Sequence, residues 1–149
     1  MNYKQYREER QAKFNALPLF WAFSEEQLQR EMEKRGVKEK SELCRFGSAL
    51  CRKVDRDQVI AFLNEPDPID DLMKKKAFAK SAFRYEMDNH EYAINWQGDW
   101  DVISAIYGEV EYHDEYSGVD YLRELGAGQA TIEAYLEARA SHLKYASNW

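Results

Sequence analysis

Residues 83–108, FRYEMDNHEYAINWQGDWDVISAIYG, constrain the fold of this chain of 149 residues more than any other stretch. They contain two of the four tryptophans and one of the three histidines, and they mark a change in the character of the sequence. Residues 1–83 hold 17 Lys and Arg against 14 Asp and Glu, whereas residues 84–125 hold two Arg against 11 Asp and Glu. A basic, helix-rich part is therefore followed by an acidic part.

The composition is that of a folded protein, with 44% hydrophobic and 14% aromatic residues. A chain of this length fits one domain, so we expect a single domain over residues 1–149. The net charge of −6 argues against direct binding to duplex nucleic acid, because such binding depends on neutralising phosphates with cations. An acidic block can instead attract a basic protein surface.

The sequence predicts neither a signal peptide nor a membrane span. The first residues are polar and charged, and no apolar run approaches the roughly 18 residues that a spanning helix needs. We therefore expect a cytoplasmic protein that has no contact with a membrane. In that compartment Cys44 and Cys51 are expected to be reduced thiols.

Residue patterns predict a helix-dominated α+β domain with a small antiparallel sheet. The sheet is expected to combine a strand near residues 19–23 with a hairpin over 43–54. Ser24 is predicted to cap a helix together with Gln27, and a long helix is predicted from about Ile69 to His90. Further helices are expected to begin at the predicted N-caps Asp99 and Thr131, and a short helix is expected near Val119–Leu125.

The hairpin pattern also accounts for the two cysteines. Gly47-Ser48 matches a two-residue type II′ turn, which places Cys44 opposite Cys51 on the more apolar face of the strands. This favours small buried residues over a metal or redox pair, because the spacing is not a usual zinc spacing and the sequence has no other Cys. We expect no metal and no cofactor.

One weak pattern could support catalysis. Glu86 and His90 are four residues apart, so they share a helix face, and Asp99 follows in the acidic segment. The sequence has no nucleophile elbow, phosphate-binding loop or dinucleotide fingerprint. We therefore expect His90 to pack or cap at the helix end beside Glu86, and keep a small enzyme centred on Glu86, His90 and Asp99 as the alternative.

A second pattern interleaves acids with aromatic residues in a way that is typical of a partner-binding surface. Carboxylates held in fixed positions can imitate a row of phosphates and occupy a cleft that binds nucleic acid, although acidic residues also serve ordinary solubility. The candidate partner-binding residues are Asp99, Trp100, Asp101, Glu109, Glu111, Tyr112, Asp114, Glu115, Tyr116 and Asp120.

A third pattern is cationic. Lys74, Lys75, Lys76 and Lys80 fall close together on the predicted long helix, and Arg45 and Arg52 share one face of the hairpin. A solvated helix surface explains such lysines in most proteins. The alternative is direct nucleic-acid binding through Lys74–Lys76 and the two arginines.

The strings YREERQAKFNALPLFWAFSEEQL and FRYEMDNHEYAINWQGDWDV, followed by GVDYL, resemble a family of small uncharacterised proteins from phages and integrative mobile elements of gut Firmicutes. The resemblance implies an accessory protein that acts in a bacterial host cell by binding a host or element protein. It also implies antagonism of a host defence, as by an anti-CRISPR or a nucleic-acid mimic. The expected function is thus non-enzymatic protein binding.

Overall fold

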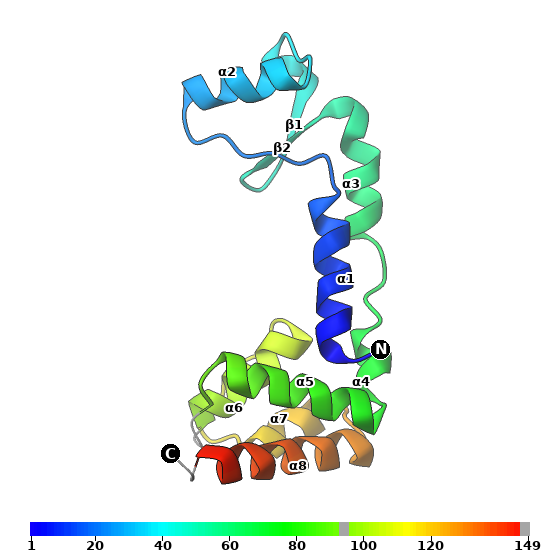
Figure 1. Ribbon diagram of the computed structural model, residues 1–149, viewed down its shortest axis with the longest axis vertical. Helices are drawn as coiled ribbons and strands as arrows, with labels where there is room; N and C mark the ends of the chain where they lie inside the picture. Colours follow the sequence, from blue (N-terminus) through cyan, green and yellow to red (C-terminus); the bar gives the residue numbers. More distant parts are fainter. Residues whose placement is uncertain (93–95, 147–149) are drawn as a thin grey trace. The chain divides into compact units, whose positions relative to one another are not determined.

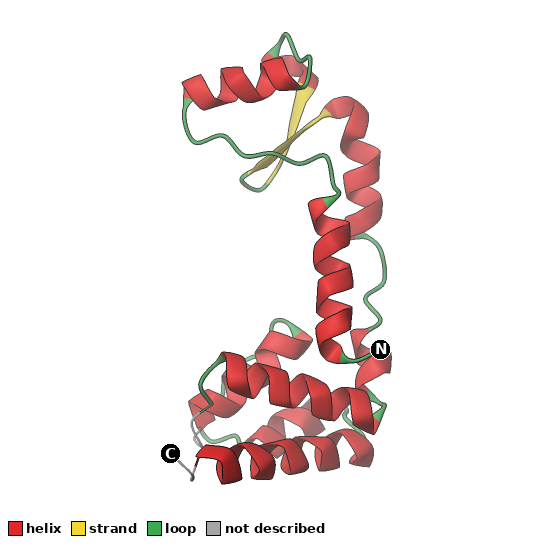
Figure 2. Ribbon diagram, in the orientation of Figure 1, coloured by secondary structure: helices red, strands yellow, loops and turns green. Residues whose placement is uncertain are grey.

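The computed structural model describes residues 1–92 and 96–146, which form two compact units. Unit 1 comprises Met1–Glu9 and Asp67–Trp149, and unit 2 comprises Arg10–Pro66. The described residues are mainly helical with one small antiparallel sheet, which confirms the helix-dominated α+β class (Figures 1 and 2). The single domain over 1–149 stays a prediction, because compact units can fold together or separately.

Unit 2 contains the sheet and three helical segments. Its elements are the part of α1 (Tyr3–Asn15) from Arg10 onward, α2 (Glu25–Lys34), β1 (Leu43–Phe46), β2 (Ala49–Arg52) and α3 (Arg56–Leu63), with short 3-10 turns at Lys40–Glu42 and Lys53–Asp55. The predicted cap by Ser24 is confirmed, because its hydroxyl accepts the backbone N–H of Gln27. The Gln27 side chain does not complete a capping box, since it accepts the N–H of Phe23 instead of that of Ser24.

The hairpin has the predicted register. Cys44 lies opposite Cys51, and Phe46 lies opposite Ala49. Gly47 has a φ of +60°, which a residue with a side chain rarely adopts and which the first central position of a type II′ turn requires. The local turn residues therefore set the pairing of both strands.

The predicted strand over residues 19–23 is wrong in extent. Only Phe20 pairs with the sheet, through an isolated antiparallel bridge to Leu50. The backbone N–H of Phe23 donates to the side chain of Gln27 instead of joining a ladder. The chain thus leaves the sheet after one bridge because its next residues form the start of α2.

Unit 1 consists of helices around one hydrophobic core. Besides the beginning of α1, it contains α4 (Ile69–Met73), α5 (Lys76–Asn89), α6 (Trp96–Tyr107), α7 (Gly118–Glu124) and α8 (Gln129–Ala146). Helices α5 and α8 lie side by side (Figure 1). Ala79 and Ala82 of α5 and Ala134 and Ala138 of α8 are fully buried, and such small residues allow helices to approach closely.

The predicted continuous helix from Ile69 to His90 is wrong, because the chain breaks it at Lys74 and Lys75. Lys75 has an extended backbone, with φ −88° and ψ 117°. The buried Thr131 hydroxyl donates to the carbonyl oxygen of Met73 at 2.7 Å and so satisfies a group that the break leaves without a helical partner. Thr131 is therefore not the N-cap of α8, which already begins at Gln129.

The predicted N-cap role of Asp99 is also wrong. Helix α6 begins at Trp96, so Asp99 lies within its first turn. Helix α7 begins close to its predicted position, where Ser117 and Asp120 cap each other's backbone N–H groups. This capping box fixes the start of α7 at Gly118, which is buried against Tyr135 of α8.

Replacing Gly118 with alanine should destabilise the protein. A Cβ atom at this position would lie 2.1 Å from the hydroxyl oxygen of Tyr135, which is itself buried and bonded. Overpacking of this kind costs about 1–3 kcal/mol. Urea unfolding should show a loss in that range for Gly118→Ala. Gly128→Ala is the matched control, since a Cβ there meets open space; equal losses for both variants would contradict the packing argument.

Candidate functional site

A buried carboxylate connects three helices of unit 1. Asp99 of α6 is 6% exposed and accepts hydrogen bonds from the hydroxyls of Tyr92 and Tyr135 and from the backbone N–H of Gly118. Tyr135 belongs to α8 and Gly118 begins α7. A buried carboxylate is tolerated when its oxygens are hydrogen-bonded, so these three donors satisfy Asp99 and join the helices that supply them.

The tyrosines of this cluster are held in their neutral, donating form. Burial raises the pKa of Tyr135 and of Tyr92 above the ordinary tyrosine value of 10.0, and the adjacent Asp99 carboxylate raises both further. Arg139 donates from Nε to the Tyr92 oxygen at 3.2 Å. The cluster therefore combines one acid, two hydroxyls and one guanidinium in a connected set of hydrogen bonds.

A second buried carboxylate, Glu86 of α5, has its own set of partners. Its Oε1 accepts from the Tyr3 hydroxyl at 2.7 Å and from Arg7 at 3.1 Å, and its Oε2 lies 3.1 Å from His90 Nε2. His90 is the C-cap residue of α5. The expectation that His90 caps the helix beside Glu86 is confirmed.

These two clusters weaken the alternative of an enzyme centred on Glu86, His90 and Asp99. Glu86 and His90 share no hydrogen-bond partner with Asp99 among the described residues, and both carboxylates are committed to protein donors. Within residues 1–92 and 96–146, no three His, Cys, Asp or Glu side chains gather in a way that could hold a metal ion. Glu86 and Asp99 therefore form two separate hydrogen-bonded clusters in the core of unit 1.

The acidic segment between α6 and α7 is held by specific hydrogen bonds. The Trp100 indole N–H donates to the carbonyl oxygen of Val110 at 2.8 Å. The buried Tyr121 hydroxyl donates to the carbonyl oxygen of His113 at 2.8 Å and accepts the N–H of the same residue at 2.9 Å. The His113 ring stacks on Tyr116, with ring centres 4.4 Å apart. The segment thus has fixed attachment points on both α6 and α7.

Five carboxylates of this segment and of the first turn of α7 are exposed, and we call them the acidic loop surface. They are Glu109, Glu111, Asp114, Glu115 and Asp120. None of the five forms an ion pair with a Lys or Arg of the described chain, and Glu111 has only His113 at 3.9 Å. The charges of Glu109, Glu111, Asp114 and Glu115 therefore face solvent, whereas the Asp120 carboxylate also accepts hydrogen bonds from the N–H and the hydroxyl of Ser117.

The remaining candidate binding residues have different environments. Asp99 is buried, so its expected place on a negative surface is wrong: its carboxylate is used inside the core. Asp101 is half-buried and accepts a hydrogen bond from the Gln97 side chain. Trp100 and Tyr116 are half-buried, while Tyr112 is 37% exposed with its ring edge against Trp100.

Three of the four lysines in the predicted patch, Lys74, Lys76 and Lys80, have carboxylate groups within 4 Å. Lys74 pairs with Asp71, and Lys76 pairs with Glu133 and Glu137 of α8. Lys80 also lies 3.7 Å from Glu137. Cations that already have carboxylate partners release less free energy when they meet phosphates, so the structure offers little support for nucleic-acid binding here.

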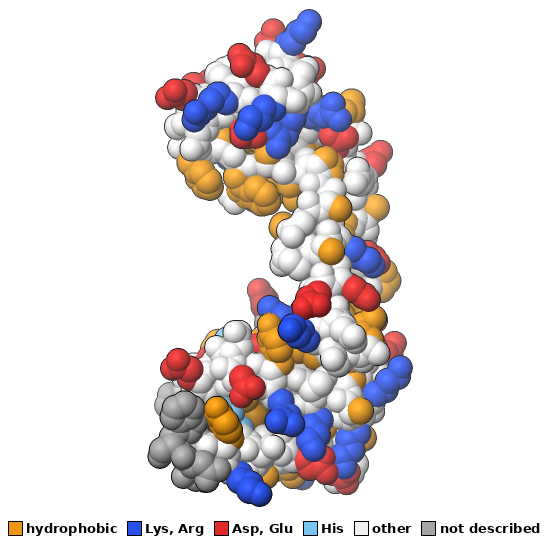
Figure 3. Space-filling model, viewed as in Figure 1, with side chains coloured by type: hydrophobic (Ala, Val, Ile, Leu, Met, Phe, Trp, Pro, Cys, Tyr) orange, Lys and Arg blue, Asp and Glu red, His pale blue; other side chains and the backbone are white. Residues whose placement is uncertain are grey.

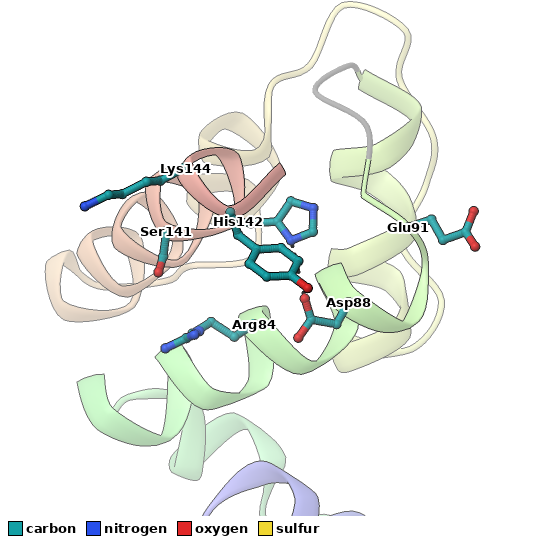
Figure 4. A pocket seen from close by; sticks show the side chains of 7 residues that line it. Arg84, Asp88, Glu91, Ser141, His142 and Lys144 are labelled. Carbon is teal, nitrogen blue, oxygen red and sulfur yellow. Dashed lines mark ion pairs between the residues drawn. The ribbon is translucent and has the colours of Figure 1, made fainter. Parts of the chain in front are cut away.

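Unit 1 also has a pocket of about 680 Å³ between α5 and α8 (Figure 4). Asp88 and His142 face each other inside it, with Oδ1 and Nδ1 3.4 Å apart, while Glu91 and Lys144 point away from that pair. Its lining residues are Arg84, Asp88, Glu91, Ser141, His142, Lys144 and Tyr145. The Asp88 side chain is 73% exposed, so its interaction with His142 is weak.

Unit 2 has a smaller hollow of about 270 Å³ beside α2. Trp21 and Phe23 supply rings, and Phe23 is 84% exposed. Arg30 and Lys34 supply cations, of which Lys34 is paired with Glu31 of the same lining at 3.3 Å. On the face drawn in Figure 3, basic side chains of unit 2 lie next to hydrophobic ones. Exposed rings beside cations can hold a flat or acidic group.

The model of a protein family of unknown function, DUF7659, matches residues 2–107. The chain belongs to the DUF7659 family. The matched residues run from α1 to the end of α6 and include Glu86, Tyr92 and Asp99. Gly118 and Tyr135, which complete the partners of Asp99, and the acidic loop surface lie beyond the match. No curated protein and no solved structure matches the chain.

Among the described residues of this DUF7659 protein, no helix is both long enough and apolar enough to cross a bilayer.

Replacing Asp99 with asparagine should strongly destabilise the protein. The amide nitrogen would face a hydroxyl or N–H donor in a buried site, and losing a charged acceptor there costs about 3 kcal/mol. Asp101→Asn is the control, because its exposed amide oxygen can still accept from Gln97, and it should change stability by less than about 0.5 kcal/mol. Chemical denaturation measures the free energy of unfolding of both variants. An Asp99→Asn protein as stable as Asp101→Asn would refute the stabilising role of the Asp99 cluster.

The buried tyrosines predict a loss of stability in alkali. Burial raises the pKa of Tyr3, Tyr92 and Tyr135, and it raises the pKa of Tyr107 to about 12. Unfolded tyrosines release their protons near pH 10, so the stabilisation is complete below that pH and is lost as the pH rises further. The free energy of unfolding in urea should be lower at about pH 11 than at about pH 8. Equal free energies of unfolding at the two pH values would show that these hydroxyls ionise in the folded state with the ordinary tyrosine pKa.

Proposed function

We propose that this DUF7659 protein is a non-enzymatic binding protein whose acidic loop surface engages a basic surface on another protein. The observation that carries the proposal is a set of five exposed carboxylates with no Lys or Arg partner in the described chain, on a segment attached to α6 and α7. Opposite charges across an interface raise the association rate and reject wrong partners.

The attachment of the segment adds to this argument. A loop that is already ordered loses little conformational entropy when a partner binds. The hydrogen bonds from Trp100 and Tyr121 hold the backbone at Val110 and His113, between the acidic side chains. The backbone positions that carry the acidic side chains therefore keep their spacing.

An aromatic residue adds an apolar contact to the charge. Tyr112 lies between Glu111 and His113 in the chain and exposes 37% of its surface. Tyrosine is enriched at protein interfaces because it combines a large ring with a polar hydroxyl. A partner that normally binds nucleic acid would present the cations that this surface requires. Action in a phage or mobile element, against a host defence, extends the proposal and rests on the sequence resemblance alone.

The test is affinity capture from nuclease-treated lysate with a charge-reversed variant. Glu109, Glu111, Asp114 and Glu115 are changed to lysine together, and the control changes four exposed glutamates elsewhere by the same charge. The control positions are Glu8, Glu9, Glu26 and Glu33.

A protein retained by the wild type and by the control, but lost from the loop variant, is the expected result. Binding of that protein should weaken by at least about tenfold in the loop variant and should fall as salt rises. A partner that binds the loop variant and the control equally, or no partner once nucleic acid is removed, would contradict the proposal.

A further inference from the structure

The two cysteines of unit 2 are in contact across the hairpin. Cys44 of β1 lies directly opposite Cys51 of β2, and their Sγ atoms are 3.1 Å apart. Both are free thiols. Cys51 is fully buried, whereas Cys44 is half-buried and can be reached from solvent. One accessible and one enclosed sulfur are thus held side by side.

The backbone around the pair fits a disulfide. The N–H and C=O of Leu50 bond to Phe20, so they point away from β1. Because these groups alternate along a strand, those of the next residue, Cys51, point toward β1. Opposed residues of this kind have Cα atoms about 5.5 Å apart. Disulfides span Cα separations of about 4.4–6.8 Å, so the Cα spacing expected for this pair is compatible with the bond.

We propose that Cys44 and Cys51 form a reversible intramolecular disulfide when the protein meets a low-molecular-weight disulfide such as oxidised glutathione. This modification site is independent of the proposed protein-binding function, because it lies on the hairpin of unit 2 and the acidic loop surface lies in unit 1. Cys44, the accessible thiol, reacts first with the added disulfide, and the buried Cys51 then reacts with Cys44.

The reaction balances as two thiol–disulfide exchanges. The Cys44 thiolate attacks one sulfur of oxidised glutathione, which forms a mixed disulfide and releases one glutathione thiolate that takes up a proton. The Cys51 sulfur then loses its proton to solvent and attacks Cys44 Sγ, which releases the second glutathione. Two protein thiols are oxidised, and one glutathione disulfide is reduced to two glutathione molecules.

The environment of Cys51 determines how fast the second step proceeds. Burial, together with the contact to Cys44, raises the pKa of the Cys51 thiol to about 12. Only the thiolate attacks, so ring closure should accelerate as the pH increases. The neighbouring charged groups are Asp55, which raises this pKa, and Arg56, which lowers it.

The test uses the full-length reduced protein, oxidised glutathione, an acid quench and intact mass spectrometry. The wild type should lose the mass of two hydrogen atoms, retain no glutathione, remain a monomer on a non-reducing gel, and recover its mass with dithiothreitol. Cys51→Ser should stop at a glutathione adduct on Cys44. Cys44→Ser should stay unmodified, because its remaining thiol is buried.

Circular dichroism verifies that each variant is folded, and Cys51→Ala and Cys44→Ala replace any serine variant that is not. A wild type that keeps both thiols, accumulates the adduct or forms only intermolecular disulfides would overturn the proposal. A folded Cys44 variant that reacts as fast as the Cys51 variant would overturn the assigned order of attack. Faster ring closure at higher pH would support the role of Cys51 as the second nucleophile.

Discussion

The carboxylate of Asp99 is the interaction on which the arrangement of unit 1 most depends. It lies on α6 and accepts hydrogen bonds from α8 through Tyr135 and from α7 through the N–H of Gly118. An ionised group removed from water is costly unless donors surround it, so each helix must take a position that supplies its donor. The same requirement explains why the residue at 118 is glycine, since a side chain there would collide with Tyr135.

The acidic loop surface depends on this cluster through its two ends. The loop leaves α6, which carries Asp99, and enters α7, whose first residue bonds to Asp99. Trp100 and Tyr121 then fix the backbone between these ends. Acidic residues on a loop with such supports keep a defined spacing, which is the property that selective recognition of a basic surface needs. The hydrogen bonds to Asp99 in the core and the proposed binding surface on the loop are therefore structurally linked.

Features encoded by neighbouring residues could be predicted from the sequence. Gly47-Ser48 determined the hairpin register, and Ser24 determined the start of α2. Features that depend on residues far apart in the chain could not be predicted from the sequence. The break after α4 is supported by Thr131, which lies 58 residues from Met73, and Asp99 is buried by Tyr135, which lies 36 residues away. Local patterns cannot reveal such partners, so Asp99 resembled its exposed acidic neighbours in the sequence, and Tyr92 and Tyr135 gave no signal of their role.

Whether the acidic loop is ordered can be measured by ¹⁵N relaxation of its backbone amides. We expect the amides from Val110 to Tyr116 to have order parameters near those of the helices, about 0.85. The His113 amide, which bonds to Tyr121, should be among the most ordered of them. Order parameters below about 0.6 across this segment would contradict this expectation, because carboxylates on such a mobile chain would have no fixed spacing to present.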